Sequence, residues 1–232
     1  MYNHEMTIGY EIRVCDSCGL RYPLLQGHPH GPRCPICKGS TRVVLSRELV
    51  IEPARDRPDS FHREEQKIAK GLKEERGKSL AVLLDNIRSA WNAGSILRSA
   101  DGFGFAQAYL CGITPTPENE AVKKTSLGAE DSVTWSYHKD AVKLVKGLKV
   151  EGWKVYALEE DERAKEMGRK DEGGRMNEKA VLIIGNEVTG VDPELLDLCD
   201  EIFHIPMRGE KKSFNVAMAF SIAAYAITSP GG

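Results

Sequence analysis

The 232-residue sequence lacks several features that would place it in familiar classes. It contains no run of about 18 apolar residues, so no membrane-spanning helix is expected, and residues 1–9 lack the apolar core of a signal peptide. No G-x-G-x-x-G follows an expected strand and no G-x-x-x-x-G-K-[ST] occurs, which excludes the usual dinucleotide and P-loop sites. We therefore expect an intracellular, cytoplasmic protein with no membrane partner.

The sequence also lacks a large excess of either sign of charge, because the formal net charge is only −2. Its distribution is uneven: residues 1–77 carry 13 Lys and Arg against 11 Asp and Glu (+2), and residues 78–232 carry 19 against 23 (−4). Within residues 13–47, six basic residues face Asp16 alone (+5). A small basic segment on a mildly acidic body suggests contact with a polyanion at the N-terminus, although a solvated charged surface fits the same composition.

Four of the six cysteines form two C-x2-C pairs with 15 residues between them: Cys15, Cys18, Cys34 and Cys37. This spacing is typical of four-cysteine zinc sites, because a tight turn presents both thiolates of a pair to one tetrahedral ion, and Gly19 and Gly39 supply turn freedom after each pair. Two disulfides would need an oxidising compartment that nothing else indicates. His28 and His30 could replace a ligand, but two complete pairs leave no vacancy. We predict a zinc-ribbon-like module over residues 1–50 whose metal is structural, since so short a segment has little core of its own.

Beyond residue 78 the sequence alternates between short apolar runs and helical patterns. Strands are expected at 80–84, 108–111, 133–137, 154–158, 180–184 and 201–205, and helices at 93–103, 141–151 and 193–198. This alternation predicts an α/β domain with a mainly parallel sheet over residues 79–232. Residues 51–78 are expected to form a charged linker, with a helix over 61–76.

The stretch 205–217 is expected to be the working centre of the chain, since it joins the last strand to a final helix. Apolar residues recur there at helical spacing and mark one face of the helix: Phe214, Met218, Ile222 and Tyr225. Ser213 is a natural N-cap, so the helix would begin there and bring Asn215 and free backbone N–H groups to one place. Such a place can hold a polar ligand.

Two further polar clusters follow expected strands, where open α/β sheets bind ligands. In the first, residues 86–98, Asn92 can cap a helix, and Arg98 lies among small and apolar residues, which favours a phosphate or carboxylate partner. An ion pair of Arg98 with Asp85 or Asp101 is the alternative. In the second, residues 185–190, glycines flank Glu187, which is expected at a pocket rim. A plain strand-to-helix turn is the alternative there.

Together these stretches resemble a known family. Residues 92–104 (NAGSILRSADGFG) look like the first motif of the SpoU/TrmH family of RNA ribose 2′-O-methyltransferases in the SPOUT superfamily. Residues 185–191 (GNEVTGV) are similar to the second motif, and residues 205–207 (IPM) with 213–217 (SFNVA) to the third. The likeness covers about two thirds of the chain, and all three motifs stand in the expected order.

The resemblance implies a C-terminal trefoil knot, S-adenosylmethionine as cofactor and a homodimer with composite active sites. By position, it implies catalytic roles for Arg98, Asn92, Glu187, Ser213 and Asn215. It implies cofactor-binding roles for Leu158 (a weaker match), Gly185, Asn186, Glu187, Gly190, Ile205, Met207, Ser213, Phe214 and Asn215. Arg98 would act as a base assisted by substrate phosphate or as a phosphate clamp.

The expected function is therefore methyl transfer to a ribose 2′-hydroxyl of tRNA or rRNA. The alternative is a non-catalytic, zinc-containing RNA-binding or assembly factor that keeps the fold. The loop 208–212 is more charged than the family pattern, and the cysteine module lies outside the family's common core. We expect that module to recognise RNA through shape and phosphate.

Overall fold

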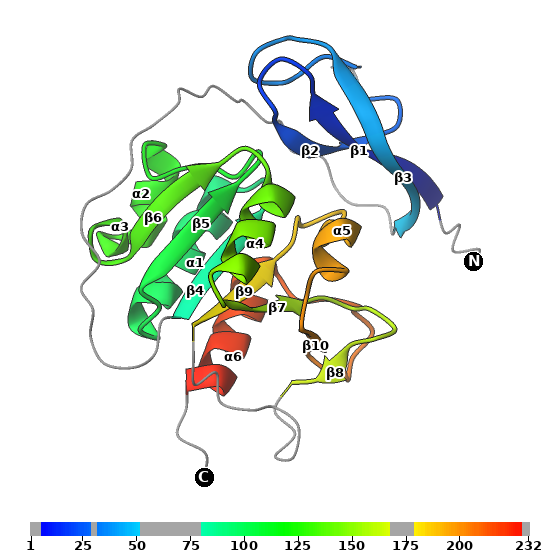
Figure 1. Ribbon diagram of the computed structural model, residues 1–232. Coiled ribbons are helices and arrows are strands. Elements are labelled where there is room, and N and C mark those ends of the chain that lie inside the picture. Colours follow the sequence, from blue (N-terminus) through cyan, green and yellow to red (C-terminus); the bar gives the residue numbers. More distant parts are fainter. Residues whose placement is uncertain (1–5, 29–31, 52–79, 168–178, 229–232) are drawn as a thin grey trace. The chain divides into compact units, whose positions relative to one another are not determined.

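The computed structural model describes residues 6–28, 32–51, 80–167 and 179–228 (Figure 1). The chain divides into two compact units, Met1–Gln66 and Lys67–Gly232. The predicted domain limits at residues 50 and 78 stay predictions, because residues 52–79 lie outside the described part of the chain. The helix expected over 61–76 lies there as well.

The N-terminal unit contains a three-stranded antiparallel sheet in the order β2-β1-β3. Its strands are β1 (Met6–Cys15), β2 (Arg21–Leu25) and β3 (Thr41–Ile51). Tyr10, Ile12 and Tyr22 are buried, so each is shielded from water although the unit is small. Sequence reasoning predicted the cysteine module but none of these strands.

The C-terminal unit is built on a seven-stranded sheet in the order β6-β5-β4-β9-β7-β10-β8, and every neighbouring pair is parallel. The strands are β4 (Leu80–Asp85), β5 (Gln107–Cys111), β6 (Thr134–His138), β7 (Lys154–Leu158), β8 (Lys165–Glu166), β9 (Ala180–Ile184) and β10 (Glu201–His204). The predicted α/β class and mainly parallel sheet are thus confirmed. The trefoil knot stays a prediction.

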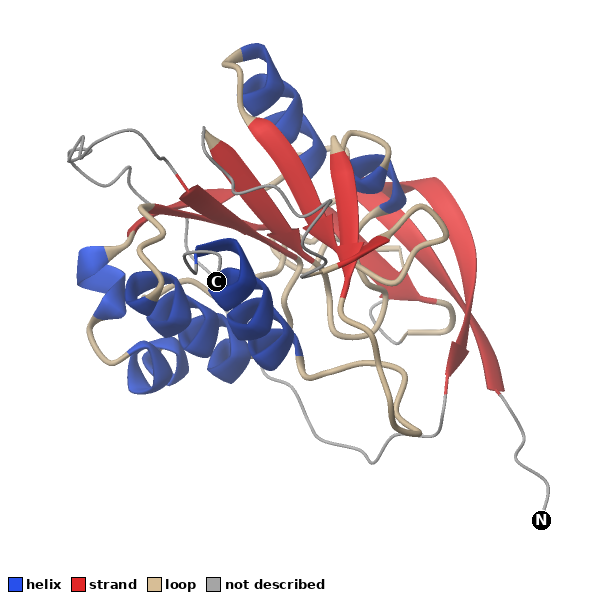
Figure 2. Cartoon of the chain, turned by 90° about the horizontal axis from the view of Figure 1, so that it is seen from below, coloured by secondary structure: helices blue, strands red, loops and turns tan. Residues whose placement is uncertain are grey.

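Helices cover both faces of this sheet (Figure 2). They are α1 (Ala90–Gly102), α2 (Glu120–Ser126), α3 (Ala129–Ser132), α4 (Ala141–Val150), α5 (Pro193–Leu196) and α6 (Val216–Thr228). Because side chains alternate along a strand, Val82 of β4 packs in a core with α1 and α6, and Leu83 packs in a second core with α4 and α5. Burial on both faces explains why the central strands are continuous apolar runs.

The final helix differs from its predicted position and orientation. It begins at Val216 rather than at Ser213. Its buried side is formed by small residues around Phe220, which is fully buried against Phe105. The predicted apolar face is instead exposed: Phe214 in the preceding loop is 42% exposed, Met218 58% and Tyr225 64%.

Candidate active site and metal centre

Glu187 is the hydrogen-bond centre of the candidate active site. It follows β9, and its carboxylate accepts the backbone N–H groups of Arg88 (2.8 Å) and Ser89 (3.0 Å). The same carboxylate accepts the side-chain amide of Asn92 (2.9 Å). One carboxylate therefore ties the loop after β9 to the loop after β4 and to the first turn of α1.

Asn215 extends this network to the third motif. Its Nδ2 donates to Asn92 Oδ1 (3.1 Å), and its Oδ1 accepts the backbone N–H groups of Ala217 (3.0 Å) and Met218 (3.4 Å). Asn215 is thus the residue that caps α6, and the cap expected at Ser213 is wrong. The three polar clusters of the sequence meet through Glu187, Asn92 and Asn215.

The first helix also starts earlier than expected. Ser89, not Asn92, is its N-cap, since the Ser89 side chain accepts the backbone N–H of Asn92 (3.3 Å). The Asn92 side chain therefore does not cap the helix. Its nitrogen donates to Glu187 and its oxygen accepts from Asn215. Gly94 serves packing rather than ligand approach, because a Cβ there would collide with Thr125 and the Val122 carbonyl of α2.

Asn186 is buried and holds the loop after β9 in shape. Its Nδ2 donates to the Asn86 carbonyl (2.7 Å), and its Oδ1 accepts the backbone N–H groups of Val188 (2.9 Å) and Thr189 (3.1 Å). Asn86 has a left-handed φ of 57° and receives the Ile113 N–H on its side-chain oxygen (3.1 Å). These contacts indicate a supporting role for the Asn186 side chain.

The glycines of the second motif permit close packing within the protein. A Cβ on Gly185 would collide with the backbone of Gly190 and Val191, and a Cβ on Gly190 would collide with the Glu159 carboxylate. Glu159 accepts the Val191 N–H (2.8 Å), and its burial raises the pKa of its carboxyl group above the usual value. Leu158, Ile205 and Met207 are half-buried at the ends of the neighbouring strands β7 and β10.

Arg98 is exposed and does not join the Glu187 network within one chain. It lies six residues beyond Asn92, which is about 9 Å along the helix axis. In the part of the chain that the structure describes, no hydrogen bond or ion pair links Arg98 to Asp85 or Asp101, the partners considered as alternatives. Ser213 and Phe214 are exposed in the loop before α6.

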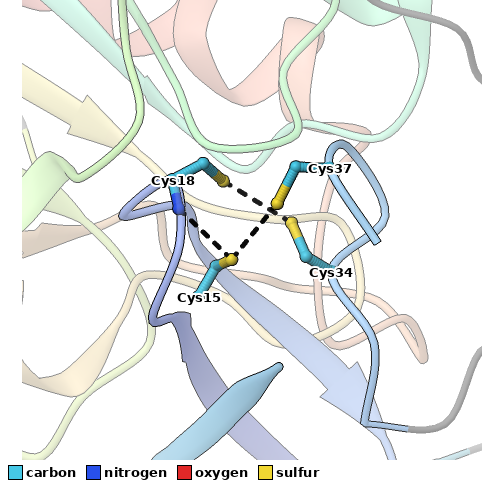
Figure 3. A group of neighbouring side chains, drawn as sticks. All are labelled: Cys15, Cys18, Cys34 and Cys37. Atoms are coloured by element: carbon cyan, nitrogen blue, oxygen red, sulfur yellow. Dashed lines mark hydrogen bonds between the residues drawn. The ribbon is translucent and has the colours of Figure 1, made fainter. Parts of the chain in front are cut away.

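The four paired cysteines converge in the N-terminal unit, and their sulfurs point toward one another (Figure 3). All four Sγ atoms lie within 4.8 Å of one another; the Cys15–Cys37 distance is 3.4 Å and the Cys18–Cys34 distance is 3.7 Å. All are free thiols. Four sulfurs bonded to a tetrahedral zinc ion at about 2.3 Å lie about 3.8 Å apart, so the donor set fits zinc and not disulfides, whose S–S bond is about 2 Å.

The two cysteine pairs form turns with the same backbone pattern. In the first, Cys15 N–H donates to the Leu20 carbonyl and Gly19 N–H to the Cys15 carbonyl; in the second, Cys34 N–H donates to the Gly39 carbonyl and Lys38 N–H to the Cys34 carbonyl. Positive φ falls on Gly19 (73°) and on Lys38 (63°), so the turn freedom expected at Gly39 is one residue too late. Gly39 instead leaves room for Ser17 and Cys37, which lets the two turns approach.

The C-terminal unit belongs to the α/β class: it has a parallel sheet, and its polar site is built from the loops that follow the strands. Within that class, the model of the SpoU rRNA Methylase family matches residues 79–225, and the chain belongs to this family. The matched residues contain every member of the Glu187–Asn92–Asn215 network and exclude the cysteine module.

Two relatives and two solved structures illustrate the likeness. The chain is 31% identical over 150 residues to a tRNA (guanosine(18)-2′-O)-methyltransferase of Thermus thermophilus, covering 65% of this chain and 74% of that protein. It is 29% identical over 164 residues to the 23S rRNA (guanosine(2553)-2′-O)-methyltransferase of Bacillus subtilis, covering 71% of this chain and 61% of that protein. The Aquifex aeolicus TrmH/SpoU tRNA modifying enzyme matches with a TM-score of 0.59 at 25% identity, over 67% of this chain and 76% of that one. The SpoU methyltransferase AviRb of Streptomyces viridochromogenes matches with a TM-score of 0.59 at 25% identity, over 66% and 60% of the two chains. AviRb has also been solved in complex with AdoMet, S-adenosylmethionine.

Proposed function

We propose that the protein transfers a methyl group from S-adenosylmethionine to a ribose 2′-hydroxyl of tRNA or rRNA. The observation that carries this function is the hydrogen-bonded network of Glu187, Asn92 and Asn215, which joins residues 95 and 123 positions apart in the sequence. Family membership and the activities of the two relatives described above support the same reaction. Both of these relatives act on guanosine.

The residues at the strand ends fit the proposed methyl donor. Leu158 and Ile205 place half-buried apolar side chains at the ends of the adjacent strands β7 and β10, next to the loop after β9. Apolar side chains with nearby backbone polar groups are suited to a nucleoside. When bound, the cofactor supplies a methyl group activated on a positively charged sulfur.

The protein's own contribution is positioning and proton removal. A ribose hydroxyl is a weak nucleophile until its proton is polarised or removed. Asn92 and Asn215 orient the ribose, and Glu187 holds Asn92 in place through the hydrogen bond between them. Arg98 acts either as the base assisted by a substrate phosphate or as a clamp on that phosphate. Ser213 assists in orienting the ribose or the arginine.

We also propose a homodimer in which Arg98 completes the site of the second copy. Arg98 is about 9 Å along α1 from Asn92, so one chain does not bring the two side chains together. Trp91 on α1 is 61% exposed, and the neighbouring α6 exposes an apolar stripe through Met218, Ile222 and Tyr225. A stripe of this kind on the surface is typical of a protein–protein interface.

The reaction is tested by titrating the protein with S-adenosylmethionine and measuring methyl transfer to tRNA and rRNA. Arg98→Ala is expected to keep cofactor binding and lose at least 100-fold in transfer, whereas Lys146→Ala, an exposed cation on α4, leaves transfer unchanged. Cofactor binding without transfer to any bulk RNA favours the non-catalytic RNA-binding alternative. Full activity of Arg98→Ala refutes the role given to that residue.

The dimer is tested by sedimentation. Met218→Lys places a charge in the exposed stripe and is expected to yield monomers that still bind the cofactor. In a second experiment, chains carrying Arg98→Ala are mixed with chains carrying Asn92→Ala, and both keep Met218. Part of the transfer should be restored, because each mixed dimer then holds one complete site. Absence of any recovery contradicts the shared site.

For the cysteine module we propose one structural zinc ion bound by Cys15, Cys18, Cys34 and Cys37. The convergence of four free thiols supports it. Metal analysis of the purified protein is expected to show one zinc ion per chain, and Cys34→Ser should lose it.

A further inference from the structure

Three neighbouring strands end beside one acidic side chain, Glu159. This residue follows β7 directly, and its backbone N–H donates to the Phe203 carbonyl of β10 (2.9 Å). On the other side, β7 pairs with β9, whose last residue Ile184 lies opposite Leu158. Glu159 therefore sits at the carboxyl ends of β9, β7 and β10, where ligands bind in open parallel sheets.

The Glu159 carboxylate is used on the backbone of the loop after β9. Its Oε2 accepts the Val191 N–H (2.8 Å), and its Oε1 accepts the Glu160 N–H (3.0 Å). Gly190, with φ of 70°, provides the space for this contact, since a Cβ at residue 190 would collide with the carboxylate. The loop is thus fastened at residue 191 by Glu159, just as Glu187 fastens it to the loop after β4.

The hydrogen bonds of Glu187 and Glu159 hold opposite ends of one short segment, residues 187–191. Residues 186 and 190 also exchange backbone hydrogen bonds (3.0 Å each), which closes the segment into a small ring. Both carboxylates therefore restrain the backbone of the loop after β9, which lies next to Leu158. A preformed backbone loses less conformational freedom when a ligand binds, and affinity rises accordingly.

We propose that Glu159 is a positioning residue for the cofactor: it fixes the loop at residues 190–191 and so preforms the pocket for S-adenosylmethionine without contacting the cofactor. This inference rests on the proposed function of the site. It assigns to Glu159 a role that none of the three motifs contains, because residue 159 lies in the segment between the first and second motifs.

Two variants of Glu159 separate its effect on the loop from a direct charge contact. Glu159→Ala removes the acceptor and is expected to weaken binding of S-adenosylmethionine by about tenfold to a hundredfold, the range for one lost hydrogen bond to a charged group. Glu159→Gln keeps one oxygen for the Val191 N–H and should remain within about threefold of the unaltered protein. Equal loss in both variants overturns the proposal, because a charge contact with the cofactor would then be needed.

Asp200→Ala provides a matched control, because it too removes a carboxylate that accepts a backbone N–H. Asp200 accepts the Val155 N–H (2.7 Å) at the opposite end of β7, so its loss perturbs the strand far from the loop. Asp200→Ala should lower the unfolding temperature but leave cofactor affinity within about twofold. If it weakens binding as much as Glu159→Ala does, the effect is general destabilisation and the positioning role is wrong.

A second measurement does not depend on the cofactor. Hydrogen exchange of the Val191 amide should become at least tenfold faster in Glu159→Ala and stay unchanged in Asp200→Ala. If the unaltered protein fails to bind S-adenosylmethionine, the proposed function fails, but faster exchange at Val191 still shows that Glu159 holds the loop. Unchanged exchange together with unchanged affinity in Glu159→Ala refutes the inference itself.

Discussion

Replacing Glu187 by alanine should damage both the stability and the activity of the C-terminal unit. The substitution removes three hydrogen bonds and a carboxylate from the N-terminal end of α1. Because Glu187 is exposed, water replaces part of each bond, so about 0.5 kcal/mol is lost per bond. The helix-terminus interaction adds about 0.5 kcal/mol. The expected loss is about 2 kcal/mol, which corresponds to a fall of about 4 to 8 °C in Tm.

Tryptophan fluorescence isolates the unfolding of this unit. All three tryptophans, Trp91, Trp135 and Trp153, lie in residues 80–228, so urea titration followed by their emission does not report on the cysteine module. Glu162→Ala is the control, since Glu162 is an exposed carboxylate in the turn before β8. It should change the unfolding free energy by less than about 0.5 kcal/mol.

Activity decides whether Glu187 also positions the reacting groups. Without its acceptor, the Asn92 side chain is held by Asn215 alone, and misplacement by about 1 Å can cost about 100-fold in rate. Methyl transfer by Glu187→Ala is therefore expected to fall by about 100-fold, measured at a temperature where the variant is folded. A variant that loses 2 kcal/mol but transfers at an unchanged rate would refute the link between the network and catalysis.

Three further outcomes follow from the packing and the metal site. Chelation of the metal should unfold the cysteine module, seen by loss of protection of Leu20 to hydrogen exchange, while S-adenosylmethionine affinity stays unchanged; a lost affinity would contradict separate roles for the two units. Gly94→Ala should lower the unfolding free energy by about 3 kcal/mol in urea titration, because its Cβ meets the Val122 carbonyl, and a neutral result would contradict the close approach of α1 and α2. Leu127→Gly should raise that free energy by about 0.5 to 1 kcal/mol, since Leu127 is 64% exposed and ends α2 at a left-handed φ of 52°. Destabilisation at residue 127 would show that its side chain makes contacts that outweigh the backbone strain.

The parallel sheet could be predicted because its central strands, β4 and β9, are buried on both faces. Residues 154–158 and 180–184 are strands with the predicted limits. Residues 180–184 are a continuous apolar run, as expected of a strand that is buried on both faces. The helices α2 and α3 and the short strand β8 were not predicted. The helices α2 and α3 contain few apolar residues, and α3 has only four residues in all. Neither helix therefore shows a helical period of apolar residues.

Helix starts were placed less well because several residues can cap. Ser89 and Asn92 both suit the start of α1, and Ser213 and Asn215 both suit the start of α6. The structure selects Ser89 and Asn215, and tertiary contacts rather than local preference make that choice. The Asn215–Asn92 contact is an example, since it spans 123 positions.

The site residues were named from motif resemblance, and their catalytic and cofactor-binding roles stay predictions. Local patterns identified Glu187 at a rim but not its three donors, because those donors come from a distant loop. Glu159 was not singled out at all. The only sequence signal was a carboxylate directly after the strand 154–158, and many surface glutamates share that position.

The side-chain amide of Asn215 has two roles. Its oxygen accepts backbone N–H groups at the start of α6, and its nitrogen donates to Asn92 in the site. The start of the last helix and the position of Asn92 therefore depend on the same side chain. Aspartate at this position would preserve the start of the helix but place an acceptor against the Asn92 oxygen, whereas serine would preserve the start and leave the contact unmade. Variation at residue 215 is thus constrained twice over, by architecture and by chemistry, even though the residue is exposed.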